Sequence, residues 1–185
     1  MPLPICPTGC STALDALPIF DFSECAPKIN SAEIRYIYIG LPGNPFTDIK
    51  IATEWTARLL TTNTGPTKLV RMTVLGDKPR PTGTVKEISG GRKVTLNKEH
   101  VLNATVDETS AANHEAFRKM ECGGITLPIW YQTAGGQVFG GNAGILVSID
   151  PGMVISRSSG DSIVWELAFS WKAKFTEEMA LSPIA

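Results

Sequence analysis

The side chains best suited to chemistry in this sequence are its two histidines, His100 and His114. Imidazole is the commonest general base, but it needs a nucleophile or a carboxylate held beside it. His100 falls within a predicted strand, and His114 falls on the polar side of a predicted helix. The sequence contains no Gly-x-Ser-x-Gly, His-Glu-x-x-His or Gly-Lys-Ser/Thr motif. We therefore expect no catalytic residues and predict that the protein is not an enzyme.

Two further groups of residues invite a chemical interpretation. Glycines gather at Gly135-Gly136, Gly140-Gly141 and Gly144, but they lie in a predicted strand hairpin, where a phosphate site would lack its helix N-terminus. We interpret them as turn and bulge residues and predict no cofactor. Of the acidic pairs, Asp107-Glu108 is expected to complement the dipole at the start of a helix, and Glu177-Glu178 is expected to be solvated.

The four cysteines are Cys6, Cys10, Cys25 and Cys122. Three residues rather than two separate Cys6 from Cys10, and no histidine lies near them to complete a tetrahedral metal site. We therefore expect reduced thiols and no bound metal.

The composition of this 185-residue chain favours a globular protein that contacts other protein. Apolar residues make up 43% of it, enough for a core, whereas charged residues make up only 19%. The 17 basic and 18 acidic residues leave a net charge of −1, which excludes a nucleic-acid binder held by charge alone and a disordered polyelectrolyte. Soluble monomers usually carry more charge, so we expect much of the surface to face other subunits.

Signals for secretion or membrane insertion are not evident in the sequence. The first basic residue is Lys28, so no charged segment precedes an apolar stretch, and we expect no secretory signal. No run of about 18 apolar residues occurs, so we expect no transmembrane helix and no membrane partner.

Hydrophobic periodicity predicts several strands and one helix. Strands are expected at 34–39, 69–75, 94–106 and 163–175, the last because seven apolar residues alternate strictly along it. Its inward face would carry Trp165, Phe169 and Trp171. A helix is expected at about 109–121, where small and apolar residues recur every fourth position before two glycines. Periodicity does not decide whether Glu54, Trp55 and Arg58 lie in a helical turn or in a twisted strand.

One long segment of the chain carries no charge. It runs for 28 residues from Cys122 to Ile149 and is expected to form a hairpin that turns at 134–136. An uncharged hairpin exposed to water would be prone to aggregation. It should therefore be covered, either by its own domain or by neighbouring copies, and the second case would make it an assembly surface.

Together these features predict a mainly β (α+β) fold, an antiparallel β-sandwich or half-barrel with one flanking helix. Residues 1–32 are expected to form a Pro- and Cys-rich N-terminal arm, residues 33–178 the β domain, and residues 179–185 a tail. Within the domain, residues 76–92 are punctuated by Gly and Pro and carry an excess of basic side chains. We expect them to form a long loop, which either contacts a partner or is a solvated linker.

The order of these features resembles that of phage tail-tube (major tail) proteins and of related ring proteins of the phage neck. The likeness covers about residues 33–178. It rests on motifs spread through that range, which are Gly76-Asp-Lys-Pro79, Lys86–Lys93, Arg118–Cys122, Trp130–Gly136 and Trp165–Lys174. The resemblance implies copies that assemble into hexameric rings, with inner strands lining a channel for DNA and the 76–92 loop contacting the next ring. The N-terminal arm departs from the family's pattern.

The resemblance further implies a structural virion protein of the phage tail, made in the host cytoplasm. Its stacked rings would conduct DNA without binding it sequence-specifically, and its partners would be further copies of itself and other tail or neck proteins. A capsid decoration, head-completion or neck ring protein has the same near-neutral, β-rich and oligomeric character and is the alternative. An enzyme or small-ligand binder is disfavoured because no cluster of titratable residues is apparent.

Overall fold

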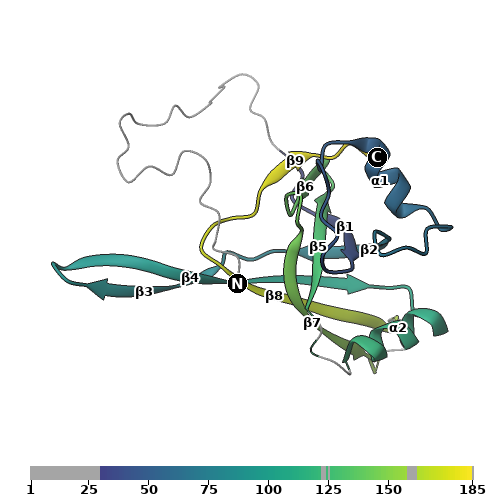
Figure 1. The fold of residues 1–185 in the computed structure, drawn as a ribbon. Helices are drawn as coiled ribbons and strands as arrows, with labels where there is room; N and C mark the ends of the chain where they lie inside the picture. The colour runs from purple at the N-terminus through teal and green to yellow at the C-terminus, as the bar shows by residue number, and fades with distance from the viewer. Residues whose placement is uncertain (1–29, 122–123, 125, 158–161, 185) are drawn as a thin grey trace, which may run out of the picture.

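The computed structural model describes residues 30–121, 124, 126–157 and 162–184. Its elements follow the order β1 (Ile34–Gly40), α1 (Ala52–Leu59), β2 (Leu69–Asp77), β3 (Thr82–Ile88), β4 (Arg92–Val106), α2 (Ala111–Glu121), β5 (Thr126–Thr133), β6 (Gln137–Phe139), β7 (Ile145–Val154), β8 (Val164–Ala173) and β9 (Met179–Leu181) (Figure 1). The predicted mainly β fold is confirmed. Residues 1–29 of the predicted N-terminal arm and all four cysteines lie outside the described residues.

Six strands close into an antiparallel barrel. Their pairing runs in the order β1-β2-β4-β8-β7-β5, and pairing of β5 with β1 completes the ring. The strands thus form one closed ring rather than the two packed sheets of the expected sandwich. The ring is weakest between β2 and β4, which pair only at Leu75–Asp77. Closure otherwise removes the free edges that an open sheet of these strands would expose.

The barrel interior is filled by alternate residues of its strands. On β8 the inward residues are Trp165, Leu167, Phe169 and Trp171, which are all buried. The prediction for this strand's inward face is confirmed, although the strand, Val164–Ala173, is shorter than the expected 163–175 and Ile163 before it is exposed. On β4, by contrast, only the second half contributes to the interior, through Leu102, Ala104 and Val106. Phe117 of α2 packs on Trp165, with their ring centroids 5.0 Å apart.

A second apolar cluster covers the outer face of β1 and β5. Tyr38 and Trp130 point outward there because successive residues of a strand face opposite sides of the sheet. Trp55 of α1 is fully buried against them, with its ring centroid 4.9 Å from that of Tyr38. The segment that periodicity left undecided is therefore helix α1. The described residues hold two helices, not the one expected.

A buried ion pair fastens α1 to the loop before it. Arg58 donates hydrogen bonds to the Glu54 carboxylate at 2.7 Å and to the carbonyl oxygens of Asn44 and Pro45 at 2.7 and 2.6 Å. Burial acts to raise the pKa of Glu54, but the backbone N–H of Thr47 and the Arg58 guanidinium outweigh it and lower that pKa. The pair therefore holds α1, which carries Trp55, against the loop before it and has a structural role.

The described residues of the uncharged segment are mostly covered by the domain itself. The segment comprises β5, a turn, the short β6, a second turn and β7, so the expected return strand is broken into two. Ile129, Val138 and Val147 are 0%, 1% and 0% exposed. Of the two ways of covering this segment, the structure shows the first, and the segment gives no argument for assembly. The predicted C-terminal tail is also part of the sheet, because β9 pairs with β6.

Candidate assembly surface

Residues 82–99 form a β-hairpin that projects from the barrel. β3 pairs with the first half of β4 from Thr82/Glu99 to Ile88/Arg92, and the turn is made by Gly90 and Gly91 at φ +83° and +71°. Figure 1 shows this projecting hairpin extending away from all other elements. The prediction of a long loop at 76–92 is therefore wrong in structure. β2 continues to Asp77, and the segments on both sides of the glycine turn pair with one another as β3 and the first half of β4.

The projecting hairpin buries almost none of its side chains in its own subunit. Every residue of β3 is exposed, and the apolar Val85, Ile88 and Leu96 are 57%, 37% and 46% exposed. A two-stranded hairpin is at best marginally stable in water when nothing packs on it. Its exposed apolar side chains therefore mark it as a contact surface.

The strand register gives the hairpin two different faces. Lys86 lies opposite Val94 and Ile88 lies opposite Arg92, so these four residues and Leu96 share one side, here called the basic face. The other side carries Val85, Glu87, Lys93 and Thr95. The basic face thus combines three apolar residues with two cations and no carboxylate.

The base of the hairpin is held by a buried polar cluster. Lys78 and Glu177 form an ion pair at 2.6 Å, with only 16% and 4% of their side chains exposed. The hydroxyl of Tyr131 donates to Glu177 at 3.3 Å, and the Lys78 ammonium lies 5.6 Å from the centre of the Trp171 ring. The expectation that Glu177 is solvated is wrong, because the chain after β8 folds back against the hairpin's base.

His100 belongs to the same cluster. It is fully buried, stacks on Trp171 with ring centroids 5.2 Å apart, and places Nδ1 3.0 Å from Oε1 of Glu177 without the alignment of a hydrogen bond. Burial lowers the pKa of His100 below its usual 6.5, against the opposing effect of the Glu177 charge. Burial, with the nearby Glu177 carboxylate, also raises the pKa of Tyr131. The ion pair and these aromatic contacts join the base of the hairpin to the end of β8 and the chain after it, which suits them to fixing the hairpin's direction.

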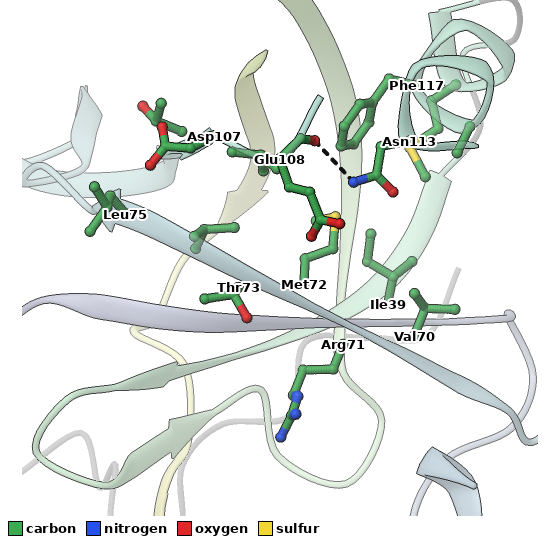
Figure 2. Close-up of a pocket in the computed structure, with 15 residues that line it drawn as sticks. Ile39, Val70, Arg71, Met72, Thr73, Leu75, Asp107, Glu108, Asn113 and Phe117 are labelled. Atoms are coloured by element: carbon green, nitrogen blue, oxygen red, sulfur yellow. Dashed lines mark hydrogen bonds between the residues drawn. The ribbon is translucent and has the colours of Figure 1, made fainter. Parts of the chain in front are cut away.

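A groove of about 650 Å³ lies at the opposite end of β4, where β2 diverges from it. One wall is formed by β2 from Val70 to Leu75, and the other by the end of β4 and by α2 through Asn113, Phe117 and Met120. Figure 2 shows Met72, Phe117 and Ile39 gathered around this space, while Arg71 points away from it. The Arg71 guanidinium lies instead over the Tyr36 ring, 5.1 Å from its centre.

Two carboxylates border this groove. Asp107 and Glu108 were expected to open the helix, but α2 begins at Ala111 and Ser110 caps it through a 3.3 Å hydrogen bond to the N–H of Asn113. The carbonyl of Glu108 accepts from the Asn113 amide at 3.0 Å (Figure 2). Both acidic side chains are exposed, and within the described ranges neither has an ion-pair partner. They give the groove a negative rim.

The other residues that the sequence singled out for possible chemistry do not gather at one place. His114 lies over Trp165, at a centroid distance of 5.5 Å. Gly140, Gly141 and Gly144 form the turn before β7, as predicted, and carry positive φ. Among the residues described, no three His, Cys, Asp or Glu side chains gather as metal ligands would.

Comparison with known proteins assigns this chain to no family. No protein-family model matches the chain, and no curated protein matches its sequence. In the part of the chain that the structure describes, no helix has the length and apolar character needed to cross a membrane.

Sequence reasoning located part of this surface. It singled out residues 76–92 and their basic side chains, but it missed the groove and the cluster at the hairpin's base. The sequence contained a pattern that predicts the hairpin, because the β-rich runs Thr-Val-Lys-Glu-Ile and Arg-Lys-Val-Thr-Leu flank the turn residues Ser89-Gly-Gly91. No local sequence pattern predicts the pairing of Lys78 with Glu177, because 99 positions separate them.

Proposed function

We propose that the protein is a structural subunit that self-assembles through its projecting hairpin. The observation that carries this proposal is that the hairpin exposes both faces, apolar residues included, while its base is fixed by a buried ion pair. A rigidly directed hairpin with no partner in its own subunit is suited to binding another chain. Because its direction is already set, little ordering cost accompanies that binding.

The geometry favours a head-to-tail arrangement of copies. The hairpin tip and the groove lie at opposite ends of β4 (Figure 1), which spans 15 residues and hence about 45 Å. The tip of one subunit is therefore directed away from its own groove. Contacts between unlike surfaces of identical chains form closed rings or helical filaments.

The most specific form of this proposal is a phage tail-tube subunit whose stacked rings conduct DNA within the virion tail. Its support is the resemblance in the order of features, together with the near-neutral composition and the projecting hairpin at the position of the family's inter-ring loop. The main alternative within the same class is a decoration, head-completion or neck ring protein, which would form isolated rings or knobs.

Sedimentation velocity of the full chain tests self-assembly. Replacing Thr84–Asn97 by an Asn-Gly turn removes the hairpin's outer part and keeps the Gly83/Lys98 pair at its base. We expect concentration-dependent large species for the unmodified protein, and a folded shortened variant that forms nothing larger than a single ring. Leu60→Ser is the control, because Leu60 is an exposed apolar residue, 51% accessible, that follows α1 and is not part of the hairpin. Assembly by the shortened variant equal to that of the unmodified chain would refute the proposal.

A further inference from the structure

The groove contains an unpaired strand edge. β2 pairs with β1 along its length, but on its other side it reaches β4 only at Leu75–Asp77. Within the described part of the chain, no strand pairs with that side of Leu69–Val74. Every second residue of this six-residue stretch therefore directs its N–H and C=O into the groove. Such an edge is the usual acceptor for an added strand.

β3 offers a complementary edge. It has seven residues and pairs with β4 on one side, and among the described strands it has no partner on the other. Its length matches the open stretch of β2. Natural proteins seldom leave two free edges exposed unless something covers them.

The charges and apolar groups of the two surfaces also match. The basic face of the projecting hairpin presents Lys86 and Arg92 beside Ile88, Val94 and Leu96. The groove presents Asp107 and Glu108 beside Met72, Phe117 and Met120. Opposite charge favours this pairing and sets its orientation, and the apolar contacts supply the buried area.

We propose that this groove is the receptor for the projecting hairpin of a second copy, with β3 adding to the open edge of β2 and the basic face turned toward Asp107 and Glu108. The proposal rests on the proposed function and names the two surfaces through which it operates. It predicts that charge reversal at Arg92 weakens self-association more than charge reversal at Lys93. The two are neighbours with the same charge, but only Arg92 lies on the basic face.

Charge reversal with sedimentation velocity tests this pairing. Arg92→Glu should raise the dissociation constant of self-association at least about tenfold, because like charges then meet at the groove rim. Lys93→Glu is the matched control and should change that constant less than about twofold. Asp107→Lys with Glu108→Lys should weaken assembly as Arg92→Glu does. Adding Lys86→Glu and Arg92→Glu to this groove variant should restore assembly. Circular dichroism of each variant checks that it is folded.

The outcomes separate this inference from the proposed function. If Arg92→Glu weakens assembly and reversal of the groove carboxylates does not, the hairpin binds elsewhere, so the receptor is wrong while self-assembly stands. Equal effects of Arg92→Glu and Lys93→Glu would overturn the assignment of the basic face. An unmodified protein that remains monomeric at every concentration would overturn both proposals.

Discussion

Lys78 and Glu177, 99 positions apart in the chain, form a 2.6 Å ion pair at the base of the projecting hairpin. One partner follows β2 and the other follows β8, so the pair joins the hairpin's root to the C-terminal part of the chain. Ion pairs this enclosed add little net stability, but breaking one leaves a desolvated charge behind. The pair's value lies in fixing one direction for the hairpin.

Replacing Glu177 tests that role. Glu177→Gln removes the charge with little change in shape and leaves Lys78 without its partner, so the free energy of unfolding should fall by about 3 kcal/mol. Glu178→Gln is the control, since Glu178 is exposed, and should change it by less than about 0.5 kcal/mol. Urea denaturation measures both. Equal, small effects would show that Glu177 is not held by the cluster.

The same cluster predicts a dependence of stability on pH. The pKa of His100 is lowered in the folded protein by burial, so the unfolded chain binds a proton more readily. The stability contributed by neutral His100 is present above its unfolded pKa of about 6.5 and is lost as pH falls through the lower folded pKa. The melting temperature should therefore fall more steeply below pH 6.5 than it does in His100→Gln. His114→Gln serves as the control for loss of a histidine, and matching slopes in all three proteins would contradict the argument.

The barrel core gives a prediction about packing. Phe169 is 0% exposed on β8, between Leu167 and Trp171, so Phe169→Ala should lower the free energy of unfolding by about 3–5 kcal/mol through the cavity it leaves. Ser170→Ala, at the exposed neighbouring position, should leave it almost unchanged. Thermal melts that coincide for the two variants would mean that β8 does not line the interior.

Substitutions at two glycines distinguish the cost of backbone strain from the cost of steric crowding. Gly136 and Gly144 have similar φ of +78° and +74°, but a Cβ at Gly136 would meet nothing within 4 Å, whereas one at Gly144 would lie 2.8 Å from the Trp130 ring. Gly136→Ala should cost about 1–2 kcal/mol for its left-handed backbone alone. Gly144→Ala should cost about 1–3 kcal/mol more because the ring must shift. Equal costs in chemical denaturation would show that the Trp130 side chain moves freely.

Local patterns predicted most of the fold. The alternation along β8 and the recurrence at every fourth position in α2 both predicted the correct element. In each case the residues of the buried face repeat at a fixed interval within one short segment. The half-exposed β4 was harder, since Val94 and Leu96 continue the same alternation out of the barrel into the hairpin. Pro79, Pro81 and Gly83 suggested a loop, yet they stand before and at the start of β3, where a strand tolerates them.

The candidate site was predictable only in part. The basic residues of the hairpin were visible in the sequence, but the faces they occupy depend on the β3–β4 register. The groove arises because β2 and β4 separate after three paired positions, which is a property of barrel closure and not of any one segment. Burial of Glu177 likewise depends on how the chain returns after β8. Long-range placement of this kind has no local signature.

Electron microscopy of the purified full chain in negative stain tests the central claim most directly. We predict rings with an axial hole at low micromolar concentration that stack into tubes as concentration rises, and no tubes from the variant that lacks Thr84–Asn97. Fields of single particles from the unmodified protein at every concentration would contradict this prediction.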